Sequence, residues 1–224
     1  MEKIIEQVQE WEFLKKFPHE IFGFTLINEL MTCGSQYRIF TYNNQPAHRS
    51  LTGLYDQATK DFFIRTIIGL TEQCDIRFFA PDLATFEKIL TERLKKTLQQ
   101  LAVFDPDSVC AQFKLKKVLE WPYVTKLPAQ IADFNLFVTP DKPFKALNGS
   151  YVIIDYSDFA AESNFTINYN IFRDEFYSEI RLRRVPIMTT AFDAKTLPEL
   201  EARLNDNLIQ SIENVRLQLG GSSK

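Results

Sequence analysis

The stretch VQEWEFLKKFPHEIFGF at residues 8–24 returns 110 residues later as VLEWPYVTKLPAQIADF at residues 118–134. Seven of these 17 positions are identical, whereas average residue usage gives about one identity by chance. The identities include Trp11 with Trp121 and Pro18 with Pro128. A repeat of this length predicts that one structural unit occurs twice in the chain.

The correspondence continues at an offset of 114 residues, after a four-residue insertion near Pro140–Pro143 in the second copy. One offset runs through strand-like and helix-like segments, which shared periodicity alone does not produce. We therefore expect a tandem duplication with a first unit at 1–107 and a second at 108–224. The further matches are Tyr37/Tyr151, Ile39/Ile153, Tyr42/Tyr156, Tyr55/Tyr169, Phe62/Phe176, Leu83/Leu197, Glu87/Glu201, Leu90/Leu204 and Leu94/Leu208.

Hydrophobic periodicity predicts the same order of elements in both units. A helix comes first, followed by four or five strands that include a polar-tipped hairpin, and a long helix with one apolar stripe closes the unit. Thr196 and Glu199 have the spacing of a capping box, and Gly220 is placed to end the second long helix. In the first unit we expect helix 2–16, strands 22–30, 37–43, 51–55, 61–68 and 74–79, and a long helix from Leu83 to Leu101. In the second unit we expect helix 112–121, strands 134–139, 151–156, 164–172 and 176–185, and a long helix from Leu197 to Val215.

Because strands follow one another instead of alternating with helices, the expected fold class is α+β. Each antiparallel sheet would be covered by its long C-terminal helix, and the two units would associate with pseudo-two-fold symmetry, as in a homodimer.

Composition narrows the function classes. The chain has 224 residues and a formal net charge of −3, which disfavours nucleic-acid binding. It has only 7 Gly, so glycine-rich phosphate loops are not expected, and its 3 Cys lack the spacing of a zinc site. No apolar run is long enough for a transmembrane helix, and the first residues do not resemble a signal peptide. We therefore expect a cytoplasmic protein with no cofactor, no metal and no membrane contact.

The repeated Glu-Trp pairs, Glu10-Trp11 and Glu120-Trp121, allow two interpretations. They could form a ligand box in which each indole stacks on a ring, or each Trp could be a core residue that anchors the first helix. Trp11 shares a helical stripe with Ile4 and Val8, which favours the core interpretation. Both indoles are therefore expected to be buried.

No catalytic set stands out. Cys33 and His48, with Asp56 as an orienting group, could in principle form a nucleophilic pair, but nothing in their spacing requires it. Cys74 aligns with Met188 at the offset of 114, so an apolar packing position is the preferred interpretation of that thiol. We predict no catalytic residue and no metal ligand.

The two hairpins differ on the side that should face away from the long helix. In the second unit this side reads Tyr177, Glu179, Arg181 and Arg183, whereas in the first it reads Phe63, Arg65 and Ile67. Apolar residues at positions that are polar in the other copy imply a cover, which we expect to be the other half of the chain for Phe63. A partner surface is expected to begin at the rim near Arg65 and Ile67. The candidate binding residues are Phe63, Arg65, Ile67, Arg181 and Arg183.

These features favour a non-enzymatic cytoplasmic interaction protein of the adaptor, chaperone or inhibitor type, built as a fused pseudo-dimer. Its partner would be a protein, and the chain itself would be a monomer or a weak homodimer. The alternative is a small-molecule binder or hydrolytic enzyme with an apolar cavity between the long helix and its sheet. Convergent polar residues in such a cavity, such as Cys33, His48 or Asp56, would favour the alternative.

Overall fold

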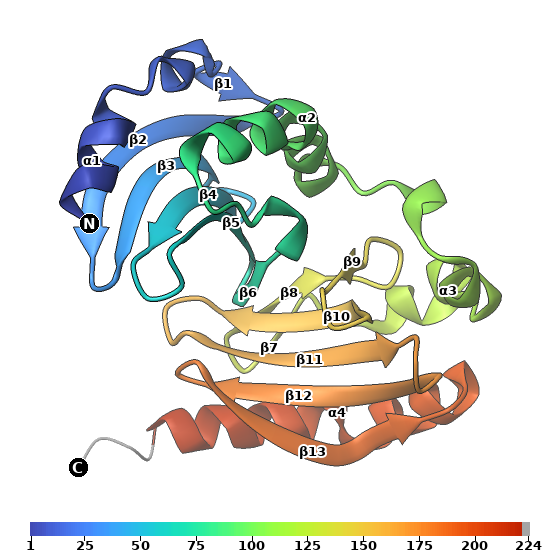
Figure 1. The fold of residues 1–224 in the computed structure, drawn as a ribbon. Helices are drawn as coiled ribbons and strands as arrows, with labels where there is room; N and C mark the ends of the chain where they lie inside the picture. The colour runs from blue at the N-terminus through green and yellow to red at the C-terminus, as the bar shows by residue number, and fades with distance from the viewer. Residues whose placement is uncertain (221–224) are drawn as a thin grey trace. The chain divides into compact units, whose positions relative to one another are not determined.

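The computed structural model describes residues 1–220, and the chain divides into two compact units, Met1–Val103 and Phe104–Lys224. Each unit contains one antiparallel sheet and two of the four α-helices (Figure 1). The α+β fold class predicted from the sequence is confirmed.

The first unit is a six-stranded meander in which every strand pairs with its neighbours in sequence, in the order β1-β2-β3-β4-β5-β6. Helix α1 (Glu2–Gln9) precedes the sheet and helix α2 (Leu83–Ala102) follows it. Two short 3-10 segments, η1 (Glu12–Lys16) and η2 (Ile76–Phe78), flank the strands. The strands are β1 (Glu20–Ile21), β2 (Phe24–Cys33), β3 (Gln36–Asn44), β4 (Arg49–Asp56), β5 (Asp61–Ile68) and β6 (Thr71–Cys74).

The second unit has seven strands in the order β13-β12-β11-β10-β8-β7, and β9 pairs with β10 beside this path. Its helices are α3 (Ala111–Leu115) and α4 (Leu197–Gly220), with 3-10 segments η3 (Pro106–Ser108), η4 (Val118–Glu120) and η5 (Pro122–Lys126). The strands are β7 (Gln130–Ile131), β8 (Phe134–Val138), β9 (Phe144–Lys145), β10 (Ser150–Asp158), β11 (Ser163–Asn170), β12 (Glu175–Leu182) and β13 (Val185–Ala194).

The apolar stripes of the long helices are buried as the periodicity predicts. Helix α2 packs on β5 and begins at Asp82, whose carboxylate accepts the Thr85 N–H (2.7 Å). Helix α4 packs on β12 and β13, and the predicted capping box is present, because Thr196 and Glu199 exchange side-chain to backbone hydrogen bonds. Gly220 is the last described residue of α4. The buried stripe residues are Phe86, Leu90, Leu94, Leu98 and Leu101 in α2 and Leu200, Leu204, Leu208, Ile212 and Val215 in α4.

The first helices are shorter than predicted. Helix α1 stops at Gln9, because Trp11 adopts an extended backbone that turns its indole into the core and a 3-10 segment follows. The expected helix at 112–121 is likewise divided, since Lys117 has a left-handed φ of 56° between α3 and η4.

Two strand predictions are also wrong. Strand β6 ends at Cys74, because the Asp75 carboxylate accepts the Arg77 N–H (2.9 Å) and caps the 3-10 segment η2. Strand β13 was missed, as were the short strands β1, β7 and β9, so the units have six and seven strands where four or five were predicted. Arg183 and Arg184 both have positive φ and form the turn that leads the chain back into β13. The second residue of this strand is Pro186, and a proline makes a strand harder to predict from the sequence.

The two Trp residues are buried, as the core interpretation predicts, with 9% exposure for Trp11 and 5% for Trp121. Their indoles reach the long helices: Trp11 Nε1 donates to Glu87 Oε2 (2.7 Å), and Trp121 Nε1 donates to Glu201 Oε2 (3.2 Å). Trp11 also stacks on Phe86 of α2, with ring centroids 6.1 Å apart. Each Trp therefore fastens the N-terminal segment of its unit to the long helix.

Replacement of either Trp by Ala is expected to lower the free energy of unfolding by about 3–5 kcal/mol, because the lost indole leaves a cavity. Trp→Phe keeps most of the volume and removes the hydrogen bond to Glu87 or Glu201, so a loss of about 1–2 kcal/mol is expected. Urea unfolding monitored by circular dichroism measures both. A loss below about 1 kcal/mol for Trp→Ala would contradict the anchoring role.

Candidate functional site

Phe63 lies on β5 with its side chain on the sheet face opposite to α2, since the adjacent Phe62 stacks on Phe86 of that helix. It is buried, with 6% exposure. The Phe79 ring lies parallel to it, with centroids 4.8 Å apart and 7° between the planes. Part of its cover therefore comes from the segment after η2 in the same unit, a source that the hairpin comparison did not anticipate.

Arg65 is on the same sheet face as Phe63, and only some of the N–H donors of its guanidinium have hydrogen-bond partners. Its Nη1 donates to Gln36 Oε1 (3.3 Å) and to Glu72 Oε1 (3.4 Å). Its Nε is buried and has no hydrogen-bond partner in the described part of the chain. Ile67 is half-buried and pairs across the ladder with Glu72. This Nε–H is an unsatisfied donor in the interior, where an acceptor from a partner does not reach it.

An apolar rim borders these residues where β6 ends. Ile76 is 81% exposed and Phe79 is 36% exposed, although Phe79 stacks on buried Phe63. Between them, Arg77 is held by Asp75 through three side-chain hydrogen bonds of 2.5–3.0 Å. We call Phe63, Arg65, Ile67, Ile76 and Phe79 the β6 rim.

The packing position expected for Cys74 is wrong, because this thiol is exposed at the end of β6. Met188, its match in the second unit, is 71% exposed. Both residues lie on the outermost strand of a sheet, where one side has no neighbouring strand to bury it.

The candidate arginines of the second unit make local contacts. Arg181 and Glu179 form an ion pair (3.0 Å), and each side chain is 26% exposed. Arg183 does not continue the strand, since it lies in the turn after β12, and its Nη2 donates to the carbonyl of Leu219 in the last turn of α4 (3.3 Å). A cation at the C-terminal end of a helix is stabilising, so Arg183 has a structural role there.

A buried polar cluster on the second unit's sheet face opposite to α4 was not foreseen. Asp155 on β10 is fully buried, accepts Ser157 Oγ at Oδ1 (2.7 Å), and receives the Asn164 amide at both oxygens (3.3 Å each). Burial raises the pKa of Asp155 to about 6, although Ser157, Asn164 and the charge of Arg181 oppose that rise. The β11 pattern, with Asn164, Thr166 and Asn168 between apolar residues, was the available signal for a polar face.

The nucleophilic set considered for an enzyme is not assembled. Asp56 pairs with Gln36 at one end of the β3–β4 ladder, and Cys33 also pairs with Gln36. His48 lies in the turn at the other end, next to the closing pair Asn44↔Arg49. The turn with His48 and the ladder end with Cys33 and Asp56 are therefore separated by the length of eight strand residues, at about 3.3 Å per residue. This separation is too long for the three side chains to meet.

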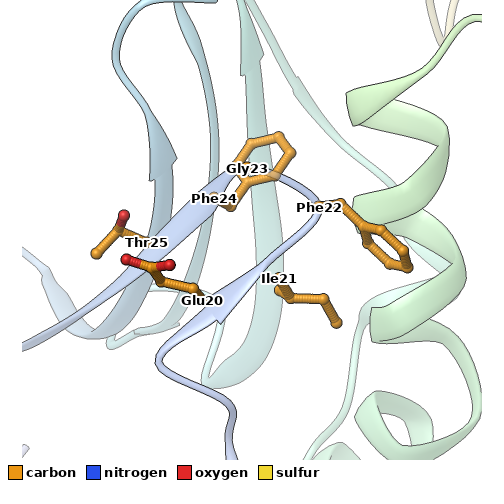
Figure 2. A pocket seen from close by; sticks show the side chains of 6 residues that line it. All are labelled: Glu20, Ile21, Phe22, Gly23, Phe24 and Thr25. Carbon is orange, nitrogen blue, oxygen red and sulfur yellow. The ribbon is translucent and has the colours of Figure 1, made fainter.

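A hollow of about 340 Å³ lies beside the β1–β2 hairpin and is lined by six consecutive residues, Glu20–Thr25 (Figure 2). The Phe22 side chain points away from those of Glu20 and Thr25 (Figure 2). A hollow formed by a single hairpin holds few convergent polar groups, which is unlike a usual ligand site.

Residues 1–220 contain neither a cluster of metal ligands nor a helix that could span a membrane. Within residues 1–220, no group of three or more His, Cys, Asp and Glu residues is placed to hold a metal ion. No helix in the described chain has the length and hydropathy needed to cross a bilayer.

Comparisons with known proteins found no relative. No protein-family model matches the sequence, and no match was found among curated proteins or solved structures.

Asp155 is expected to make stability depend on pH. An unfolded aspartate loses its proton near pH 4, whereas Asp155 in the folded protein keeps its proton up to about pH 6. The free energy of unfolding therefore falls as the pH rises from about 4 to about 6. Asp155→Asn is neutral at every pH and should be more stable than wild type by about 1–3 kcal/mol at pH 7.5, with the difference lost near pH 4. Urea unfolding at pH 4, 5, 6 and 7.5 measures it.

Asp158 provides a control of opposite sign. Its burial is outweighed by the Ala161 N–H and by Arg216 (2.7 Å), so its pKa is lowered and its ionised form stabilises the fold. Asp158→Asn should therefore destabilise the protein at pH 7.5. Equal pH profiles for Asp155→Asn and wild type would contradict the assignment.

Proposed function

We propose that the chain is a non-enzymatic protein-binding module, of the adaptor, chaperone or inhibitor type, and that it docks its partner on the β6 rim. The observation that carries this proposal is the stack of exposed Phe79 on buried Phe63 beside 81%-exposed Ile76. Exposed apolar side chains that lie next to one another are typical of the centre of a protein interface.

A rim of this composition fits a protein better than a small ligand. Its residues come from a strand, a 3-10 turn and the segment after it, so it presents an open surface. We propose that the partner supplies an apolar side chain that packs on Ile76 and Phe79. The chain itself would then act as a monomer or weak homodimer.

The alternative, a ligand cavity between the long helix and its sheet, gains no specific support. The side chains that fill this space in the first unit are large and almost fully buried. Phe62 and Phe86 stack with centroids 5.6 Å apart, and Tyr55 packs on Phe62 at 4.9 Å.

We also propose that the module arose by tandem duplication. The eight residue pairs of the β3–β4 ladder, from Gln36↔Asp56 to Asn44↔Arg49, become the pairs of the β10–β11 ladder when 114 is added to each number. Both ladders have a register shift at the same place, after Arg38 and after Val152. A bulge that occurs at one position in two ladders is typical of related structures.

Contacts outside the sheets support the same proposal. Tyr42 donates its hydroxyl to the Pro18 carbonyl (2.9 Å), and Tyr156 donates to the Pro128 carbonyl (2.8 Å). The hydrogen bonds of Trp11 and Trp121 join equally matched partners. These pairs combine the offsets of 110 and 114 that the sequence contains.

In an experimental structure, residues 1–104 are expected to superpose on residues 108–217 with the offsets of 110 and 114 residues. Crystallography or cryo-electron microscopy of the full chain provides the coordinates. A β3–β4 ladder whose bulge falls elsewhere than in β10–β11 would contradict the duplication.

The docking proposal is tested with Phe63→Glu and Ile76→Glu in parallel. Phe63→Glu places a charge at a buried position, so its melting temperature should fall by about 10 °C. Ile76→Glu changes an exposed residue, so its melting temperature should stay within about 2 °C, while capture of the partner from native lysate is lost. Thermal melts and affinity capture with quantitative mass spectrometry measure these effects.

Ile209→Glu is the matched control, because Ile209 is 55% exposed on α4, in the other unit. It should bind the same proteins as wild type. If Ile76→Glu and Phe79→Glu captured the wild-type set unchanged, the β6 rim would not be the docking surface.

A further inference from the structure

The β9–β10 turn holds the only Asn-Gly pair in the sequence, Asn148-Gly149. The turn is a three-residue loop, because the Ala146 N–H donates to the Ser150 carbonyl (2.8 Å) and β9 and β10 pair beyond it. Such a loop commonly ends in a residue with left-handed backbone, and Gly149 has a φ of +79°. A Cβ at this position would also lie 2.1 Å from the Phe172 ring carbon Cε2. The fold therefore favours a glycine directly after Asn148.

The Asn148 side chain is exposed and folds back along the peptide bond that joins it to Gly149. Its Oδ1 accepts the N–H of Ser150, two residues further on (3.0 Å). This hydrogen bond keeps the side-chain carbon Cγ close to the Gly149 nitrogen, because the nitrogen belongs to the peptide that the side chain spans. The same Ser150 N–H would stabilise negative charge that develops on Oδ1. An electrophilic carbon and a backbone nitrogen are thus held near one another.

The Gly149 nitrogen is free to react, which distinguishes this turn from the β11–β12 turn. Its N–H donates to no group within residues 1–220. Asn170 makes the same kind of hydrogen bond as Asn148, since its Oδ1 accepts the Phe172 N–H (2.9 Å), but the residue after it is the β-branched Ile171. The Ile171 N–H is also engaged, because it donates to the Gly149 carbonyl (3.1 Å). The two turns therefore differ at the nitrogen that would have to attack.

We propose that Asn148 is a site of spontaneous covalent modification, at which the side-chain amide is lost and an isoaspartate or an aspartate is formed. The Gly149 nitrogen gives its proton to hydroxide and attacks Cγ of Asn148. The Cγ–Nδ2 bond then breaks, and the leaving nitrogen takes a proton from water and departs as ammonia, which leaves a five-membered cyclic imide. Water opens this ring. Cleavage of the bond between Cγ and the nitrogen gives aspartate, and cleavage at the main-chain carbonyl gives isoaspartate.

The isoaspartate product changes the turn that contains it. It has one extra methylene in the main chain and adds one negative charge. The lengthened loop disturbs the hydrogen bond that closes it and the bond from the Ile171 N–H to the Gly149 carbonyl, so the β9–β10 and β11–β12 turns are affected together. The matching turn of the first unit is Gly34-Ser35, which contains no Asn. The modification therefore concerns the second unit and does not depend on the β6 rim.

The test is prolonged incubation of the folded full chain in mildly alkaline buffer, followed by tryptic digestion and tandem mass spectrometry. One tryptic peptide, 146–173, contains both Asn148 and Asn170. Fragment ions should show that Asn148 is converted to an acid about tenfold faster than Asn170, because glycine leaves the attacking nitrogen unhindered. An isoaspartyl methyltransferase with labelled S-adenosylmethionine should label the incubated protein. Asn148→Ser keeps an oxygen acceptor but cannot form the imide, so it should show neither signal.

The modified fraction carries one more negative charge and can be separated by ion exchange. It should melt about 3 °C below the unmodified protein, since the turn loses a hydrogen bond, whereas Asn148→Ser should melt at the same temperature before and after incubation. Three results would overturn the proposal. These are equal rates at Asn148 and Asn170, isoaspartate labelling of Asn148→Ser at the wild-type level, and modification of Asn148 in urea but not in the folded chain.

Discussion

One long helix can cover only one face of an antiparallel sheet, and this constraint organises each unit. On the covered face, large aromatic side chains fill the space under the helix, as the Phe62–Phe86 stack does in the first unit. The N-terminal segment packs against the same helix, and the indole hydrogen bonds of Trp11 and Trp121 to Glu87 and Glu201 fasten it there. The surfaces left for binding are therefore the faces and edges that α2 and α4 do not cover.

The sheet faces opposite to α2 and α4 carry different side chains in the two units. In the second unit, polar residues occupy this face, and Asp155 is satisfied by Ser157 and Asn164. The matching residue of the first unit is Thr41, which shares hydrogen bonds with Glu29 and Thr52 (Thr41 to Thr52, 2.8 Å). A fully buried carboxylate costs stability near neutral pH, whereas a threonine hydroxyl does not. Of these two matched positions, only Asp155 carries this cost.

Much of the fold was predictable because it depends on local patterns. The stripes of α2 and α4, the capping box at Thr196 and the strands of both hairpins follow from periodicity and spacing. The helix 2–16 was predicted too long, because its apolar spacing continues past Gln9 although Trp11 turns the backbone to bury its ring. Strand β13 was missed, because its direction is set by the left-handed pair Arg183 and Arg184, for which residue type gives no signal.

The sites were less predictable, because they depend on contacts between segments. From the difference between the hairpins we expected the other half of the chain to cover Phe63. The stack with Phe79, which belongs to the same unit, depends on the path of the chain after β6. Arg183 was expected on a strand face and instead caps the end of α4. The cluster around Asp155 could be suspected from polar residues alternating along β11, but its burial could not be read from that pattern.

The internal repeat makes it possible to compare equivalent positions in the two units. Where both units carry the same contact, as at Tyr42–Pro18 and Tyr156–Pro128, the fold explains it. Where the two units carry different side chains, the residues around each of them differ as well. Ala58 and Phe172 occupy equivalent turns closed by equivalent side-chain caps, yet only one of them exposes an aromatic ring. The Phe172 ring lies over Gly149, and the residue that corresponds to Gly149 in the first unit, at the offset of 114, is Ser35. The larger side chain of the second unit therefore accompanies a glycine that leaves room for it.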